Sequence, residues 1–115
     1  MGSDAELSDI AALLDDEYAR DILAQTSVEP MSAADLSERC DASLPTVYRR
    51  VNQLQEHDLV TEQQQVDPDG HHYKTYRARL DRVVVDLEDG SYEVSVERVE
   101  VDPADRLTRL VEGLR

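Results

Sequence analysis

Two short helices, each opened by its own capping serine, limit what this chain can fold into more than any other feature of its sequence. Ser32 is followed three residues later by Asp35, which is the spacing of a capping box. Ser43 precedes the second helix, and Pro45 falls in its first turn, where a missing N–H costs little. The sequence therefore predicts two successive helices joined by a short turn at residues 40–42.

The second of these helices is expected to span 43–57, with one buried side. Its apolar residues recur at helical spacing, at Leu44, Val47, Val51 and Leu54. The preceding helix places Leu36 and Cys40 on one side, four positions apart. These two apolar sides predict that the helices pack against each other.

A first β-hairpin is predicted directly after the helix pair. An extended segment begins at Leu59 and ends near Val66, and a returning strand covers 71–80. The residues between them, Asp67-Pro68-Asp69-Gly70, favour a turn, because proline fixes φ and glycine permits a positive φ. Helix, turn, helix and hairpin therefore follow each other within about half of the chain.

A second hairpin is predicted around Asp89-Gly90, a pair that is typical of two-residue turns. Counting outward from this turn pairs Glu88 with Ser91, Leu87 with Tyr92, Val85 with Val94 and Val83 with Val96. The large apolar side chains of these pairs fall on one face. Arg82 meets Glu97 on the other face, which is a favourable cross-strand pair.

Three further helices are expected from apolar periodicity. The first, over 3–14, would present Leu7, Ile10, Ala11 and Leu14 on one face. Asp15-Asp16 would end it and open a second helix, with Tyr18, Ala19, Ile22 and Leu23 facing inward. The last would be capped by Asp102, with Pro103 at its first position and an apolar stripe made of Leu107, Leu110, Val111 and Leu114.

Composition limits the class of protein. The 115 residues carry 26 acidic and 12 basic side chains, for a net charge of −14, and 40% of them are apolar. No apolar run approaches the ~20 residues that a membrane span needs, and the first residues do not resemble a signal peptide. A single cysteine excludes an internal disulfide. We therefore expect a small soluble intracellular protein of the α+β class.

Lysine is nearly absent, since Lys74 is the only one beside eleven arginines. An acidic composition with so little lysine resembles that of proteins from salt-accumulating halophiles, in which carboxylates hold hydrated cations. An ordinary acidic protein is the alternative. We favour the halophilic interpretation.

The charge is distributed unevenly. Residues 43–79 carry five basic and five acidic side chains, so the whole net charge of −14 lies outside them. Residues 43–55 have two arginines and no acid, and residues 70–79 have three basic residues, two histidines and no acid. Two positive islands on an acidic background are where a site for a polyanion is expected.

The segment from Met31 to Leu54, MSAADLSERCDASLPTVYRRVNQL, resembles the helix-turn-helix of ArsR-like winged-helix transcriptional regulators of haloarchaeal type. Glu56-His57-Asp58-Leu59-Val60 is similar to the family's x-x-Gly-Leu-Val sequence at the start of the wing, with Asp58 where glycine is usual. The resemblance covers about residues 14–80. It implies a winged helix-turn-helix with an additional C-terminal hairpin and terminal helix, and sequence-specific binding of double-stranded DNA.

The DNA-binding residues would lie on the recognition helix 43–57 and on the wing 59–80. A helix fits the major groove, where arginine pairs with guanine and hydroxyl groups meet phosphates or base edges. The candidates are Ser43, Pro45, Thr46, Tyr48, Arg49, Arg50 and Gln53 on the helix, and His71, His72, Lys74 and Arg77 on the wing. Tyr48 suits core packing as well as a phosphate contact, and the two histidines suit an ordinary exposed turn.

Arg49 and Arg50 are the strongest candidates. Neither has an acidic partner within residues 43–55, so the alternative of a solvated face with helical ion pairs has little support. Cys40 takes an inward helix position and is expected to be a buried thiol. No catalytic motif stands out, and the resemblance suggests neither a metal nor another cofactor, because the cysteine pairs and clustered histidines of the family's metal sensors are missing.

The chain is expected to divide into residues 1–80, a DNA-binding domain with its N-terminal helix, and residues 81–115, a dimerisation extension. The apolar stripes of the first and last helices would build a homodimer through Leu7, Ile10, Leu14, Leu107, Leu110, Val111 and Leu114. Two recognition helices would then read half-sites about one DNA turn apart. The alternative function is a winged-helix module that binds proteins and does not read DNA.

Overall fold

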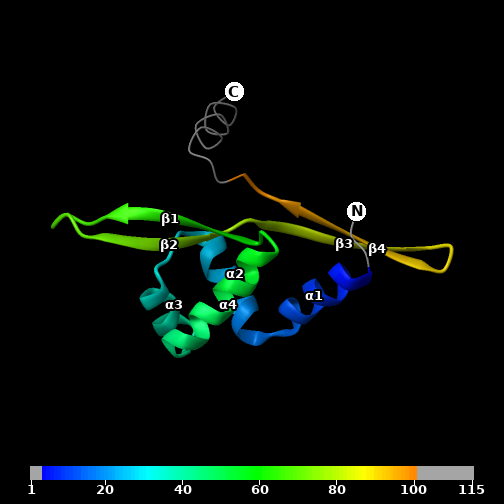
Figure 1. The fold of residues 1–115 in the computed structure, drawn as a ribbon, viewed down its shortest axis with the longest axis horizontal. Helices are drawn as coiled ribbons and strands as arrows, with labels where there is room; N and C mark the ends of the chain where they lie inside the picture. The colour runs from blue at the N-terminus through cyan, green and yellow to red at the C-terminus, as the bar shows by residue number, and fades with distance from the viewer. Residues whose placement is uncertain (1–3, 101–115) are drawn as a thin grey trace, which may run out of the picture.

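The computed structural model describes residues 4–100, which form four helices followed by four strands (Figure 1). The elements are α1 (Asp4–Asp15), α2 (Glu17–Val28), α3 (Ala33–Arg39), α4 (Leu44–Glu56), β1 (Val60–Val66), β2 (His72–Ala78), β3 (Leu80–Glu88) and β4 (Ser91–Arg98). This confirms the α+β class. The helix predicted over 102–115, with Leu107, Leu110, Val111 and Leu114, lies outside the described residues.

The helix boundaries follow the capping signals of the sequence. Asp16 caps α2, because its side chain accepts a hydrogen bond from the backbone N–H of Ala19 at 2.8 Å. Ser32 and Asp35 form the predicted capping box at the start of α3. Ser43 caps α4, with the predicted proline in the first turn.

The core lies where α2, α3 and α4 meet the base of the two hairpins. Ile22, Leu36, Val47, Val51, Leu54 and Leu59 are among its fully buried members, and Cys40 is buried as predicted. Two expectations for the first helices were wrong. In α1, Leu13 is buried and Ala11 is exposed, although Ala11 was expected on the buried face. In α2, Tyr18 is exposed although it was expected to face inward. In both helices the buried face is rotated from the one that the apolar spacing predicts.

The four strands form two separate antiparallel hairpins. β1 pairs with β2, and we call this hairpin the wing; β3 pairs with β4, and we call this hairpin the arm. The register of the arm is the predicted one, with Val85 opposite Val94 and Arg82 opposite Glu97. The turn residue Asp89 has φ 53° and Gly90 has φ 79°, which suits a two-residue hairpin turn.

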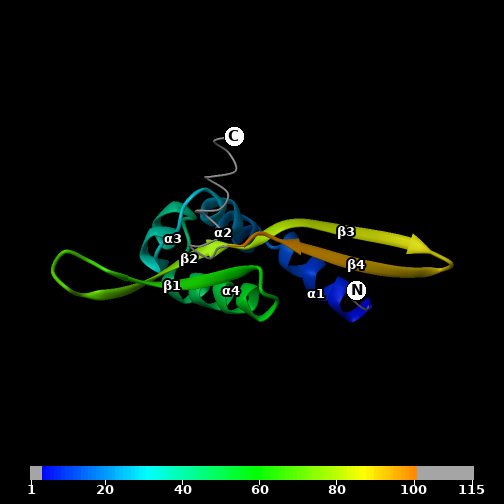
Figure 2. The ribbon, with the colours of Figure 1, turned by 90° about the horizontal axis from the view of Figure 1, so that it is seen from above.

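The wing and the arm extend in opposite directions from the helical body, as Figures 1 and 2 show. β2 passes into β3 through Arg79, so the two hairpins follow each other end to end. α1 lies along the arm, and Val94 of β4 is buried to 1% exposure on that side. The base of the arm therefore packs on its own chain, with Val83 and Val96 against the core.

The arm is also attached to the end of α4. Arg98 donates hydrogen bonds to the backbone carbonyls of His57 at 2.8 Å and Asp58 at 2.9 Å. Arg79 forms an ion pair with the carboxylate of Asp58 at 2.6 Å. Asp58 has φ 58°, which is the left-handed conformation expected at this helix end. No described helix has the length and apolar character needed to span a membrane.

Candidate nucleic-acid interface

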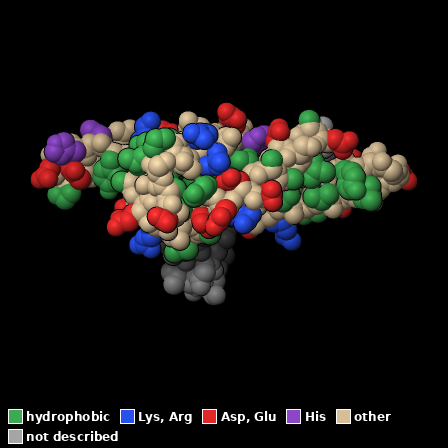
Figure 3. Space-filling model, turned by 90° about the horizontal axis from the view of Figure 1, so that it is seen from below, with side chains coloured by type: hydrophobic (Ala, Val, Ile, Leu, Met, Phe, Trp, Pro, Cys, Tyr) green, Lys and Arg blue, Asp and Glu red, His purple; other side chains and the backbone are tan. Residues whose placement is uncertain are grey.

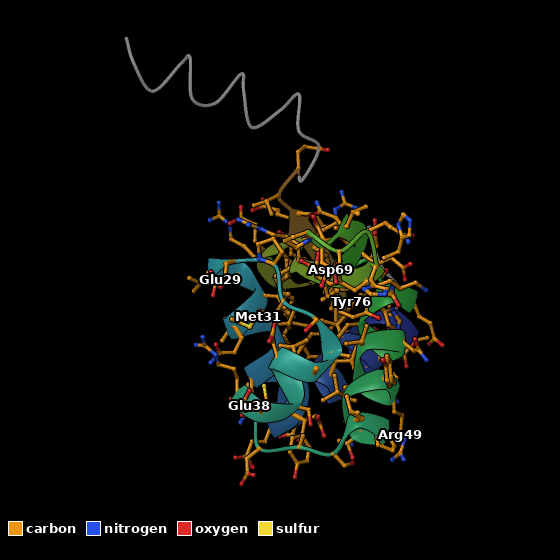
Figure 4. The ribbon with its side chains drawn as sticks, turned by 90° about the vertical axis from the view of Figure 1, so that its left-hand side faces the viewer. Glu29, Met31, Glu38, Arg49, Asp69 and Tyr76 are labelled. Carbon is orange, nitrogen blue, oxygen red and sulfur yellow. The ribbon has the colours of Figure 1, made fainter. Side chains whose placement is uncertain are left out.

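The exposed side of α4 is the centre of the candidate site. Val47, Val51 and Leu54 bury one side of this helix, and the residues opposite follow each other at spacings of three and four. These residues are Pro45, Arg49, Asn52 and Glu56, all exposed, and we call them the outer strip. Arg49, in the middle of α4, points away from the body, while Met31 and Tyr76 meet inside it (Figure 4).

Arg49 is available to a ligand, because its side chain contacts no other described residue through a hydrogen bond or an ion pair. Asn52 lies one turn further along the same strip and is equally unengaged within residues 4–100. Sequence reasoning missed Asn52. Its position three residues after Arg49 was the signal that could have identified it.

Arg50 is placed differently from the expectation. Its Nε lies 2.8 Å from the Oδ2 atom of Asp16, and its side chain is only 21% exposed. Residues 43–55 supply no acidic partner for Arg50, as expected, but Asp16 at the junction of α1 and α2 does. Arg50 also approaches the side-chain oxygen of Gln53 at 3.5 Å.

The side of α4 that carries Arg50 borders a depression of about 400 Å³ between α1 and α4. Its lining includes Asp9, Asp16, Arg50 and Gln53. Burial raises the pKa of Asp16, but the hydrogen bonds from Arg50 and from the backbone of Ala19 outweigh this effect, so the pKa is lowered overall. Asp16 is therefore ionised near neutral pH and holds Arg50 in place.

At the start of α4, Ser43 and Thr46 serve the helix itself. Ser43 Oγ accepts a hydrogen bond from the backbone N–H of Thr46 at 3.3 Å and donates one to Thr46 Oγ1 at 2.9 Å. Thr46 is partly buried, whereas Ser43 and Pro45 are exposed. Of the predicted helix residues, Pro45, Tyr48 and Arg49 are thus the exposed ones that no cap or ion pair engages.

A groove of about 740 Å³ separates α4 from the wing. Its lining includes Tyr48, Asn52 and Gln55 from α4, and Glu62, Tyr73, Lys74 and Tyr76 from the wing. The groove therefore combines aromatic rings with amides and one acid–base pair. Burial raises the pKa of Tyr76, with the charge of Glu62 adding to the effect, so the Tyr76 hydroxyl stays neutral.

Glu62 joins the helix to the wing. It accepts a hydrogen bond from the side chain of Gln55 at 2.9 Å and pairs with Lys74 at 3.4 Å. The hydrogen bond from Gln55 and the charge of Lys74 outweigh partial burial and lower the pKa of Glu62. The positive island expected on the wing is thus partly neutralised, because Lys74 meets an acid of the paired strand.

The tip of the wing carries His71 and His72, both exposed. Ligand atoms of Asp67, Asp69 and His71 lie within 4.8 Å of one another. The turn itself accounts for this proximity, since Asp67 Oδ1 accepts hydrogen bonds from the backbone N–H groups of Asp69 at 2.9 Å and His71 at 2.8 Å. Arg77 lies on the strand face opposite to Lys74 and is partly buried.

A family model matches residues 14–63 of the chain. The family is described as a helix-turn-helix domain. The matched segment covers α2, α3, α4 and the start of β1, a little under half of the chain. The comparison with curated proteins found no match.

The match and the architecture together define the fold as a winged helix-turn-helix with an additional hairpin. α3 and α4 are the two helices of the helix-turn-helix, the hairpin that follows is its wing, and the arm is the addition.

Three residues of α1 were predicted to belong to a dimer interface. Ile10 is 1% exposed within its own chain and has no surface to offer a partner, while Leu7 and Leu14 are partly exposed.

Proposed function

We propose that this winged helix-turn-helix protein is a sequence-specific regulator that binds double-stranded DNA through α4 and the wing. The observation that carries the proposal is the unpaired, exposed Arg49 on the outer strip of α4, beside Asn52. Arginine pairs with guanine and asparagine with adenine through two hydrogen bonds each in the major groove. A helix that presents both on one strip, at adjacent turns, has the chemistry of base recognition.

The residues on either side of the outer strip are suited to contact the phosphate backbone of DNA. Tyr48 lies on the flank of α4 that faces the wing and is 48% exposed, and its hydroxyl suits a phosphate. His71 and His72 at the wing tip suit the adjacent backbone or minor groove. Lys74 and Arg77 belong to opposite faces of the wing, so only one of them can follow a given row of phosphates.

We further propose that the regulator is an ArsR-like homodimer adapted to high salt. Dimerisation suits the reading of two half-sites, because each recognition helix covers only a few base pairs. The single lysine and the net charge of −14 support adaptation to salt. Arg50 is assigned a different role, which is to anchor α4 on Asp16.

The test is selection of bound sequences from a randomised pool of duplex DNA with the full chain, followed by fluorescence anisotropy on the enriched duplex. Arg49→Ala should weaken binding by ~1–3 kcal/mol and relax preference at one base pair. Arg39→Ala is the matched control, since Arg39 is an exposed arginine of α3 that lies outside the outer strip. If no sequence is enriched and both variants bind like the wild type, the proposal fails.

A second candidate function is a protein-binding module, and one observation favours it. Arg50 and Lys74, two of the cations expected to meet DNA, are already paired with Asp16 and Glu62. A surface with few free cations attracts DNA weakly. Retention of a protein partner by the wild type, lost on Tyr48→Ala, together with failed DNA selection, would favour this alternative.

A further inference from the structure

The outer edge of the arm has no partner in the described part of the chain. The sheet consists of β3 and β4 alone, so the backbone groups on the far side of β3 meet no other strand. β3 has nine residues with three consecutive valines, Val83, Val84 and Val85, which favour strand structure. A long exposed edge of this kind is a template for pairing with another strand.

The apolar face of the arm is covered on only one side. Val94 of β4 packs against α1 and is 1% exposed, whereas Val85, directly opposite on β3, is 49% exposed. Leu87 and Tyr92, the next pair toward the tip, are 60% and 50% exposed. Hydrophobic side chains accordingly gather on the surface over the right-hand part of Figure 3, where the arm and α1 lie. The unprotected part of this face is therefore the β3 side and the tip of the arm.

We propose that β3 pairs antiparallel with β3 of a second copy of this chain, about a twofold axis at Val85, to form a four-stranded sheet. An axis perpendicular to the sheet keeps the apolar faces of both arms on the same side. In this register Val85 meets the partner's Val85, and Val83 meets the partner's Leu87. Each exposed apolar residue of β3 thus gains an apolar neighbour.

Charge complementarity supports a second copy as the occupant. On the opposite face of the arm, the same register places Arg82 against the partner's Glu88, and the twofold axis produces this pair twice. Arg82 has a side chain that is 65% exposed, and Glu88 is also exposed. Opposite charges directly across an antiparallel pair are favourable.

The alternative register about Val84 fits less well, because it places Leu87 against the partner's Asp81. The position of the arm also suits a dimer. It extends away from the wing, so pairing at β3 leaves α4 and the wing of both copies accessible (Figure 2). The inference names the surface through which the proposed dimer forms. The connection of this dimer to DNA rests on the proposed function.

The first experiment measures self-association of the full chain by sedimentation velocity, without DNA, in KCl at which the chain is folded. Wild type should be a dimer. Val85→Arg places two like charges on the twofold axis and should raise the dimer dissociation constant by at least about tenfold. Val28→Arg is the matched control, because Val28 is a 77% exposed valine of α2 on the helical body, and it should leave the dimer intact.

Charge reversal tests the register. Glu88→Arg should weaken the dimer, and the combination Arg82→Glu with Glu88→Arg in one chain should bind itself more tightly than Arg82→Glu alone. Arg82 also pairs with Glu97 inside the chain, so Glu97→Gln serves as the control for loss of that contact. Circular dichroism establishes that each variant keeps its fold.

Oxidative cross-linking gives an independent measure. Val85→Cys should form a disulfide-linked dimer, because directly opposed residues of an antiparallel pair have Cα atoms within disulfide range. Val28→Cys should not. A monomeric wild type, or a dimer that Leu110→Asp dissociates while Val85→Arg does not, overturns the inference. Since these measurements use no DNA, their failure leaves the proposed DNA binding to be decided by the duplex selection.

Discussion

Arg50 of α4 and Asp16, the capping residue of α2, form an ion pair of 2.8 Å between positions 34 residues apart. The same carboxylate accepts the backbone N–H of Ala19, so one side chain closes α2 and holds α4. Two adjacent arginines in the sequence therefore have different roles. Arg49 faces outward, and Arg50 fixes the orientation of the helix that presents it.

This pair predicts that alanine substitutions at two neighbouring arginines differ in their effect on stability. Arg50→Ala should lower the unfolding free energy by about 1 kcal/mol, because the pair is largely shielded from solvent, and should lower Tm by roughly 4 °C. Arg49→Ala should leave Tm unchanged. Asp16→Ala should cost more than Arg50→Ala, because it also removes the cap of α2. Thermal unfolding followed by circular dichroism checks all three, and equal melting of the two arginine variants would contradict the assignment.

The lowered pKa of Asp16 predicts a pH dependence. The group starts from 3.8 in the unfolded chain and lies below that value in the folded one. Its contribution to stability is therefore complete above about pH 4 and is lost as the pH falls through the folded value. The difference in unfolding free energy between wild type and Asp16→Asn should shrink as the pH is lowered from about 5 to about 3. Chemical denaturation at each pH provides the measurement, and a constant difference would count against the ionised pair.

DNA binding should depend weakly on salt. Each phosphate contact releases counterions and contributes about −0.9 to the log–log slope. Here Glu56 lies on the outer strip two turns from Arg49, and Glu62 lies in the groove beside it. Bringing these acids to a duplex requires cation uptake, which opposes the release and makes the slope shallow.

The combined variant Glu56→Gln and Glu62→Gln removes this uptake and should steepen the slope of binding against KCl concentration. Glu93→Gln, on the arm, is the control and should change nothing. Anisotropy titrations on the selected duplex supply both slopes. A steep wild-type slope with binding gone well below molar salt would show that the acids take no part.

Two aspartates with positive φ allow a comparison at helix ends. Asp41 has φ 50° and no side-chain partner within residues 4–100, whereas Asp58 has φ 58° and an ion pair with Arg79. Asp41→Gly should be neutral to slightly stabilising, because glycine adopts this conformation without strain. Asp58→Gly should be less favourable than Asp41→Gly, since it also removes the ion pair. Urea denaturation ranks the two, and the reverse order would contradict this account.

Local signals in the sequence predicted much of the fold. The capping box at Ser32, the cap at Ser43 and the register around Asp89-Gly90 were all correct, because each depends on residues within a few positions of one another. Placement of side chains across the fold was harder. The partner of Arg50 lies two helices away, and no periodicity within α4 indicates it.

In the candidate site too, features set by neighbouring residues could be predicted, and features set by packing between distant segments could not. Helical spacing identified Arg49 as exposed, and it would also have identified Asn52. It did not reveal that Glu62 neutralises Lys74, since that depends on how the wing packs beside α4. Ile10 was assigned to an interface for a related reason: an apolar stripe has the same appearance whether its own chain or another covers it.

The contact of Arg98 with the backbone carbonyls of His57 and Asp58, just after α4, sets an order of events during synthesis. Arg98 lies 41 residues after His57, so this contact cannot form until nearly all of the described chain has left the ribosome. A nascent chain that already contains α4 and the wing still has these carbonyls exposed to water. The last of the described strands is therefore the one that fixes the segment directly after the helix carrying Arg49.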